Sequence, residues 1–256
     1  MKKRYVFFGV IFLLVATLFI QSKRNIINND IEDKPVEIIP KNPYLEKFLL
    51  EYDSIIQATV SETPGAAIVI VRGDSIIYSK GFGIASIKTG DSVKLNTVFR
   101  IGSLSKGFAS ILTGVISQED SLNFDDPVID YLPDFKLKTK QQTDSLTLRH
   151  VLSHSTGLIY QAYTTLIEDG LPLEQMLESL QDVDLIGKPG EYYSYQNVGY
   201  SAIEKILENH TGHTYSDLLS NKLFSPLGMT NASSTYEDIS IENAVAKPHA
   251  RGKNGW

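Results

Sequence analysis

Strand-forming residues are concentrated in one short part of this chain, and their uneven distribution limits the folds available to it. Two β-branched runs flank Gly73-Asp74 in the segment "AAIVIVRGDSIIYSKGFG", and this pattern predicts a β-hairpin. After Gln118 the sequence consists mostly of loops and short helical patterns. Helices are predicted in "SLTLRHVLSHSTGL", ending near Gly157, in the segment closed by Gly212, and in "TYSDLLSNKLFSPLGM", ended by Pro226 and Gly228. Because two strands make a poor sheet on their own, something else must complete it. We therefore expect strands near the start of the chain, followed by a long helical region.

The composition is that of a globular protein and excludes several kinds of chemistry. The chain has 256 residues, of which 42% are hydrophobic and 21% charged, enough for one large domain or two small ones. It contains no cysteine, which excludes disulfides, thiolate catalysis, cysteine-ligated zinc and a lipid anchor on cysteine. Its five histidines show no metal-binding spacing such as H-E-x-x-H. No metal or organic cofactor is expected.

The first 24 residues have the layout of an export signal. Lys2, Lys3 and Arg4 precede the uncharged run "YVFFGVIFLLVATLFI", which fits either an uncleaved signal anchor or a cleaved signal peptide. Both alternatives place the remaining chain outside the cytoplasmic membrane, in the cell envelope, either anchored to the membrane or secreted. The polar and irregular residues 25–42 are predicted to form a linker. Asn42-Pro43 at its end resembles a helix N-cap followed by proline in the first helical position.

The charge of the chain argues against nucleic-acid binding. The formal net charge is −6, and the first 24 residues contain basic but no acidic side chains, so the remainder is more acidic still. We find no basic patch with interleaved aromatic residues, and a chain this acidic is a poor partner for a phosphate backbone.

A hydroxyl and an amine stand at the start of a predicted buried helix. Helical spacing places six apolar residues on one broad face, namely Leu104, Phe108, Ile111, Leu112, Val115 and Ile116. Ser103 lies in the first turn and Lys106 follows three positions later. Burying an unpaired ammonium is costly, so the two side chains either face water or are used as a pair.

The spacing of Ser103 and Lys106 suits nucleophilic catalysis. Residues i and i+3 share a helix face, and serine needs a neighbouring base to become a good nucleophile. Desolvation makes a partly buried lysine easier to neutralise. The Ser103 N–H at the helix N-terminus could help to hold an oxyanion, and Gly102 would let a substrate approach the backbone. Ser-x-x-Lys alone is weak, because a chain of this length contains it about once by chance.

A second candidate motif is Tyr195-x-Asn197 in "YYSYQNVGY". A tyrosine whose phenolate is stabilised by a nearby lysine can act as a base. An asparagine beside it can hydrogen-bond a substrate amide and the lysine together. The alternative is ordinary aromatic packing, since the chain has 13 tyrosines.

Taken together, these segments resemble the serine β-lactamase and penicillin-binding-protein superfamily, above all class C β-lactamases and the related esterases and D-alanyl-D-alanine peptidases. The Ser-x-x-Lys motif is typical of this superfamily. The resemblance covers about residues 43–250 in family order. It rests on "PGAAIVIVRGDSIIYSKGFG", "TVFRIGSLSK", "LNFDDPVIDYLPDF", "LTLRHVLSHSTGL", "YSYQNVGY" and "PLGMTNAS".

The resemblance implies an α+β fold, in which an α/β sandwich domain is combined with an all-helical domain within residues 43–256. It also implies a serine hydrolase that forms an acyl-enzyme on β-lactams, D-alanyl peptides of peptidoglycan or small esters. Ser103 would be the nucleophile, Lys106 and Tyr195 would share the proton transfers, and Asn197 would position the substrate. The sequence does not choose between the two possible bases or among the three substrate classes.

Histidine catalysis is the less favoured interpretation of this sequence. A Ser-His-Asp triad could be built from His154, but no G-x-S-x-G motif accompanies it, and "HSTGL" resembles a structural turn of the family. We therefore interpret His150 and His154 as packed or capping residues.

The family also has a third motif, Lys or His followed by one residue and Gly, on a strand that lines the site. We interpret this motif as absent, with nothing between Met229 and Trp256 that qualifies. Lys88-Thr89-Gly90 has the right letters but precedes Ser103, and we interpret it as a turn. The expectation is a domain that lacks the C-terminal strands, with poor folding and little activity if the polypeptide ends at Trp256. The alternative functions are a membrane-tethered sensor that binds peptidoglycan or β-lactams without turnover, and an inactive fragment.

Overall fold

The computed structural model describes residues 42–60, 62–241 and 244–253. The predicted leader, residues 1–24, and residues 25–41 of the predicted linker lie outside the described residues. Within the described part, no helix is both long and apolar enough to cross a membrane. The chain divides into two compact units, one ending at Ile84 and the other beginning at Ala85.

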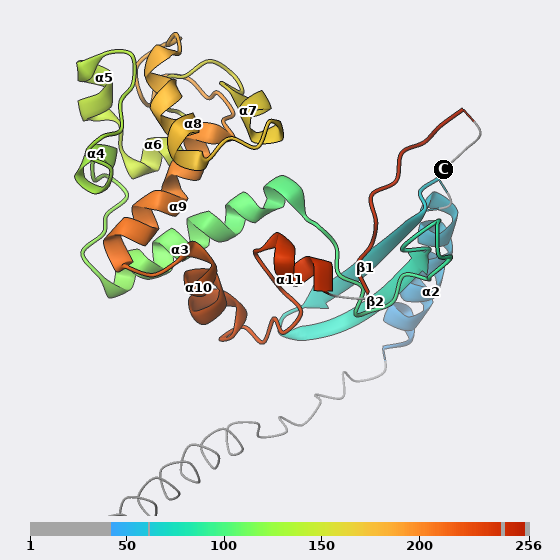
Figure 1. Ribbon diagram of the computed structural model, residues 1–256. Coiled ribbons are helices and arrows are strands. Elements are labelled where there is room, and N and C mark those ends of the chain that lie inside the picture. Colours follow the sequence, from blue (N-terminus) through green and yellow to red (C-terminus); the bar gives the residue numbers. More distant parts are fainter. Residues whose placement is uncertain (1–41, 61, 242–243, 254–256) are drawn as a thin grey trace, which may run out of the picture. The chain divides into compact units, whose positions relative to one another are not determined.

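The first unit consists of one helix and one hairpin (Figure 1). Helix α2 spans Pro43–Val60 and begins at the predicted cap, because the Asn42 side chain accepts hydrogen bonds from the backbone N–H groups of Tyr44 and Leu45. Asp53 on α2 contacts the hairpin through Tyr78 and Lys80, with both hydrogen bonds at 2.7 Å. This polar cluster fixes the helix against one strand.

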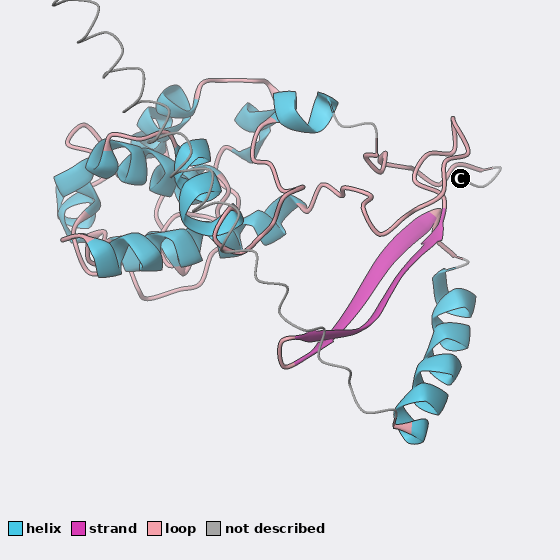
Figure 2. Ribbon diagram, turned by 90° about the horizontal axis from the view of Figure 1, so that it is seen from below, coloured by secondary structure: helices cyan, strands magenta, loops and turns pink. Residues whose placement is uncertain are grey.

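The hairpin forms where the sequence predicts it. Strand β1, Gly65–Arg72, pairs antiparallel with β2, Ser75–Gly83, with an irregularity in register between Ile70 and Val71. The connecting turn contains Gly73 with a φ of +58°, which suits glycine in a tight hairpin turn. These are the only strands longer than an isolated bridge among the described residues, and both are coloured magenta in Figure 2.

The second unit is largely helical (Figures 1 and 2). Two long helices, α3 at Ser105–Glu119 and α9 at Val198–Thr211, form its framework. The shorter α-helices are α4 (Val128–Tyr131), α5 (Lys140–Ser145), α6 (Leu148–Leu152), α7 (Thr164–Glu168), α8 (Leu173–Ser179), α10 (Tyr215–Leu219) and α11 (Tyr236–Ile241). Single turns η1 (Gly102–Leu104) and η2 (Leu180–Asp182) are 3-10 helical, and η3 (Ser220–Phe224) is π-helical.

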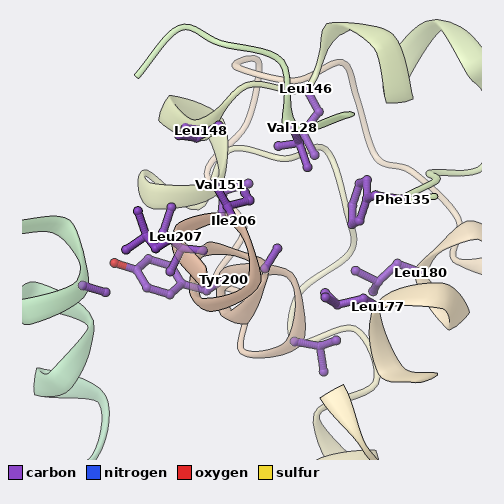
Figure 3. Packing of buried hydrophobic residues seen from close by; sticks show 14 of the residues in the cluster. Val128, Phe135, Leu146, Leu148, Val151, Leu177, Leu180, Tyr200, Ile206 and Leu207 are labelled. Carbon is purple, nitrogen blue, oxygen red and sulfur yellow. The ribbon is translucent and has the colours of Figure 1, made fainter. Parts of the chain in front are cut away.

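Helix α9 lies at the centre of the hydrophobic core of this unit, and Figure 3 shows its side chains among those of neighbouring helices. Ile206 and Leu207 on α9 are fully buried, as are Leu148 from α6 and Leu180 from η2. Helix α9 contacts α3, α4, α6, α8 and α10. It ends at Gly212, whose φ of +71° forms the left-handed cap that the sequence predicts. Because α9 is packed against these helices, the position of its N-terminal end is fixed.

Helix α3 differs from the sequence prediction in its start and in its buried face. Its α-helical part begins at Ser105, because residues 102–104 form the tighter η1 turn. Leu104 and Ile111 were placed on the buried face, but they are 74% and 58% exposed. The buried stripe is narrower than the apolar pattern suggests, and it consists of Ala109, Leu112, Thr113 and Ile116.

Two further helix boundaries differ from prediction. The helix predicted to end near Gly157 stops at Leu152, because His154 already has a left-handed φ of +55°. The helix predicted from Tyr215 to Pro226 changes at Ser220 into the π-helical turn η3. The early stop of α6 leaves the segment that follows it as a loop beside the start of α9.

Candidate active site

Ser103 is presented on the η1 turn at the entrance to α3, where its side chain is exposed. The preceding residue, Gly102, has a φ of +54°, a conformation that side-chain-bearing residues rarely adopt. A Cβ at Gly102 would meet no atom within 4 Å. Glycine is therefore needed here for the backbone conformation, and its lack of a side chain also leaves the approach to Ser103 open.

Lys106 lies one turn after Ser103, as the spacing predicts. Its Nζ donates hydrogen bonds to Ser103 Oγ at 3.2 Å and to Asn197 Oδ1 at 2.9 Å. The first contact follows from i and i+3 geometry on one helix. The second joins α3 to the N-terminal end of α9. The half-buried lysine therefore has two polar partners.

Tyr195 reaches the same serine from the loop before α9. Its hydroxyl donates to Ser103 Oγ at 2.7 Å, and the Nζ of Lys106 lies 4.9 Å from the centre of its ring. Burial of the phenol favours the neutral form. The interactions with Lys106 and Ser103 and the charge of Lys106 outweigh burial, and they hold the pKa of Tyr195 below its ordinary value.

Asn197 stands at the N-cap position of α9, but its side chain does not cap the helix. Its Oδ1 accepts from Lys106, and its Nδ2 donates to Thr164 Oγ1 at 3.4 Å. The structure thus brings all five predicted site residues into one region of the second unit. Ser103, Lys106, Tyr195 and Asn197 are joined by hydrogen bonds, and Gly102 shapes the turn that holds the serine.

Tyr200 supports this arrangement from behind and was not identified from the sequence. Its hydroxyl donates to the backbone carbonyl of Lys106 at 2.7 Å and lies 2.9 Å from Ser110 Oγ. Figure 3 shows its side chain extending from α9 with the hydroxyl toward α3. The only sequence signal is its position five residues after Tyr195, within the same motif segment.

His154 is buried next to the site, and its ring lies 4.4 Å from that of Tyr195. Its Nδ1 accepts a hydrogen bond from the backbone N–H of Gln196 at 3.1 Å. His150 instead caps α6, because its Nδ1 accepts from the N–H of Thr147. These contacts agree with the prediction of packed and capping histidines. Burial is the main cause that lowers the pKa of both rings.

Four segments have the letters of the third motif, at residues 88–90, 188–190, 210–212 and 253–255. Residues 188–190 precede Tyr195, and residues 210–212 lie at the C-terminal end of α9. Lys88-Thr89-Gly90 forms a turn, in which the Gly90 N–H donates to the Ser86 carbonyl and Gly90 has a φ of +75°. Lys253-Asn254-Gly255 also has these letters and was not assigned from the sequence, but Asn254 and Gly255 lie outside the described residues. Among the described residues, no group of three His, Asp or Glu side chains is placed to hold a metal ion.

A comparison with known protein families decides the relationship that this geometry suggests. The Beta-lactamase family model matches residues 52–256. The chain belongs to the beta-lactamase family. The family that the motifs predicted is therefore confirmed.

Individual relatives of this beta-lactamase-family chain point the same way. Protein flp of Staphylococcus aureus (strain NCTC 8325 / PS 47) is 27% identical over 190 residues, which cover 72% of this chain and 38% of that protein. The chain therefore spans less than half the length of this relative. The octameric penicillin-binding protein homologue from Pyrococcus abyssi shares 28% identity with a TM-score of 0.69, over 84% of this chain and 49% of that one.

A third similar protein is EstCE1, a hydrolase with promiscuous acyltransferase activity. It is 25% identical, with a TM-score of 0.69, over 80% of this chain and 57% of its own. These comparisons confirm the predicted β-lactamase/transpeptidase-like fold. The chain covers only part of each neighbour and is mostly helical, with few strands among the described residues.

Proposed function

We propose that this chain acts as a serine hydrolase through an acyl-enzyme on Ser103, with β-lactams, D-alanyl peptides or small esters as substrates. The observation that supports this proposal is the convergence of two proton-bearing groups on one nucleophile. Tyr195 Oη lies 2.7 Å from Ser103 Oγ and Lys106 Nζ lies 3.2 Å from it. Both distances are within reach for proton transfer.

Tyr195 is the group that we assign as the base. Lys106 donates to both Ser103 and Asn197, so in this arrangement it is a donor to the serine oxygen and not an acceptor of its proton. The hydrogen bond and the charge of Lys106 act against burial, favour the phenolate of Tyr195 and lower its pKa. The ionised phenol accepts the Ser103 proton while Oγ attacks the carbonyl carbon of the substrate.

The remaining steps follow from the same contacts. When the tetrahedral adduct collapses, the bond to the leaving nitrogen or oxygen breaks, and the leaving group takes the proton from Tyr195. Water then hydrolyses the ester on Ser103 and restores the hydroxyl. We assign stabilisation of the oxyanion to the Ser103 N–H, in the η1 turn. Asn197 holds Lys106 and aligns an amide of the substrate.

We also propose an extracytoplasmic location in the cell envelope. The support is the sequence of residues 1–24, in which basic residues precede an uncharged apolar run. A peptidoglycan peptide is an accessible substrate in that compartment.

Covalent labelling tests the proposed nucleophile. The chain is incubated separately with a fluorescent penicillin, a fluorophosphonate and a chromogenic ester, and the adduct is located by peptide mass mapping. We expect a single adduct on Ser103, lost in Ser103→Ala and retained in the matched variant Ser105→Ala. Labelling elsewhere, or none by a folded chain, would contradict the proposal. A stable penicillin adduct without turnover would favour the sensor instead.

A further inference from the structure

Three aromatic rings lie next to one another behind the nucleophile, each tilted against the next, and a histidine is the middle one. The ring of His154 lies 4.4 Å from the ring of Tyr195 and 4.9 Å from that of Tyr200, with interplanar angles of 32° and 31°. Tyr193 contacts the histidine edge-on at 5.9 Å. His154 is only 9% exposed, so one face of the Tyr195 ring rests on a buried side chain.

His154 also binds the backbone on both sides of Tyr195. Its carbonyl accepts from the N–H of Ser194 at 2.7 Å, and its Nδ1 accepts from the N–H of Gln196 at 3.1 Å. Ser194 is 5% exposed and Gln196 is fully buried. One residue thus fixes the chain before the tyrosine, the chain after it and the tyrosine ring itself.

We propose that His154 is a positioning residue for Tyr195, and that it performs this role as a neutral imidazole. The inference rests on the proposed function of Tyr195. The accepting Nδ1 has no proton in this tautomer, so the lone pair on Nδ1 is the feature that the loop requires. Protonation of the ring would place a hydrogen on Nδ1. This hydrogen would point at the N–H of Gln196, and the hydrogen bond between them would be lost.

The surroundings of the ring keep it neutral. Among the residues that the structure describes, the titratable groups in contact with His154, or acting on it, are Lys106 on α3, Tyr193 and Tyr195 in the loop before α9, and Tyr200 on α9. None of them is a carboxylate that would stabilise an imidazolium. Burial, and then the charge of Lys106, lower the pKa of His154 below its ordinary value.

Two substitutions of His154 test the hydrogen-bond acceptor at Nδ1 and the aromatic ring separately. His154→Asn keeps an acceptor near the Nδ1 position, cannot titrate and suits the left-handed φ of +55° at this position. His154→Phe keeps a ring for the stack but leaves the buried Gln196 N–H without a partner. His213→Asn, at an exposed histidine, is the matched control. Circular dichroism and thermal unfolding establish that each variant is folded.

The first readout is the rate of Ser103 acylation by a fluorescent penicillin as a function of pH and probe concentration. We expect His154→Phe to lower the maximal rate by about 10- to 100-fold with little change in half-saturating concentration, because Tyr195 is displaced. His154→Asn should lose less. In wild type, the acylation rate should also depend more steeply on pH below the pKa of His154. In His154→Asn, the acylation rate should show no such change. A folded His154→Phe with the wild-type rate would overturn the proposal.

The second readout does not require acylation. The pKa of the Tyr195 phenol is measured by NMR with carbon-13 at the tyrosine Cζ, and the Tyr195 signal is identified with Tyr195→Phe. We expect this pKa to move in His154→Phe and to stay unchanged in His213→Asn. An unmoved pKa in folded His154→Phe would overturn the positioning role. If wild type is never acylated but the pKa still moves, the proposed function fails while the positioning role stands.

Discussion

The hydroxyl of Tyr195 lies 2.7 Å from the hydroxyl of Ser103, although 92 positions separate the two residues in the chain. The serine stands on a turn before α3, and the tyrosine stands on a loop before α9. The contact therefore depends on how these two helices pack, and on the residues that fix their ends.

Removal of the Tyr195 hydroxyl should slow acylation far more than removal of another tyrosine hydroxyl in the same loop. In Tyr195→Phe the Ser103 proton has no phenolate acceptor, and we expect the acylation rate to fall by about 10²- to 10⁴-fold. Tyr192→Phe is the matched control, since Tyr192 is half exposed. The measurement is stopped-flow acylation with a fluorescent penicillin. Equal rates in the two variants would exclude Tyr195 as the base.

Loss of the Lys106 charge should raise the pKa of Tyr195. In Lys106→Met only burial and Ser103 still act on the phenol, so its ionisation moves to higher pH. In wild type the acylation rate should rise with pH and level off below pH 10, because the active form is the phenolate. Titration by carbon-13 NMR measures the shift, with exposed Lys140→Met as the control. A pKa that is the same in Lys106→Met would refute this assignment.

At two glycines with left-handed backbone, substitution by alanine should lower the stability of the protein by different amounts. A Cβ on Gly157 would lie 2.4 Å from the carbonyl oxygen of Gly187, whereas a Cβ on Gly170 would meet nothing within 4 Å. Gly170→Ala should lower the free energy of unfolding by about 1 to 2 kcal/mol from backbone strain alone. Gly157→Ala should cost clearly more. Urea unfolding of both variants measures the difference, and equal losses would argue against the close contact.

Neighbouring residues on α3 should report which face of the helix is buried. Leu112 is completely buried, and Ile111 is 58% exposed. Leu112→Ala should lower the free energy of unfolding by about 2 to 5 kcal/mol, while Ile111→Ala should change it by no more than about 0.5 kcal/mol. Thermal and urea unfolding provide both values. Similar losses in the two variants would instead support the broader buried face predicted from the apolar pattern, which includes both residues.

The sequence predicts those parts of the site that depend on local geometry. Ser103 and Lys106 lie three positions apart on helical backbone, so their proximity follows from the spacing. The hairpin at Gly73 and the caps at Asn42 and Gly212 depend equally on local residue chemistry. Tyr195 and Asn197 could be named as candidates from their chemistry, but only the family resemblance, and not the spacing, implied that they lie beside the serine.

Parts of the structure that depend on packing between distant segments could not be predicted in this way. Leu104 and Ile111 fit the apolar face of a helix, but only the positions of neighbouring helices decide which residues become buried. The support given by Tyr200 depends on the approach of α9 to α3. The contacts of His154 depend on the left-handed backbone after α6, which no local pattern signals at a histidine.

The hydrogen bond from Tyr200 to the Lys106 carbonyl has a consequence for engineering the site. Tyr195 and Tyr200 come from one short segment, and their hydroxyls donate to the side chain of Ser103 on η1 and to the main chain of Lys106 in the first turn of α3. A small shift of α9 therefore carries nucleophile and lysine together instead of pulling them apart. Substitutions of buried residues on α9 should therefore move Ser103 and Lys106 together relative to a bound substrate. Such substitutions offer a way to alter substrate selectivity while the hydrogen bonds among the catalytic residues are kept.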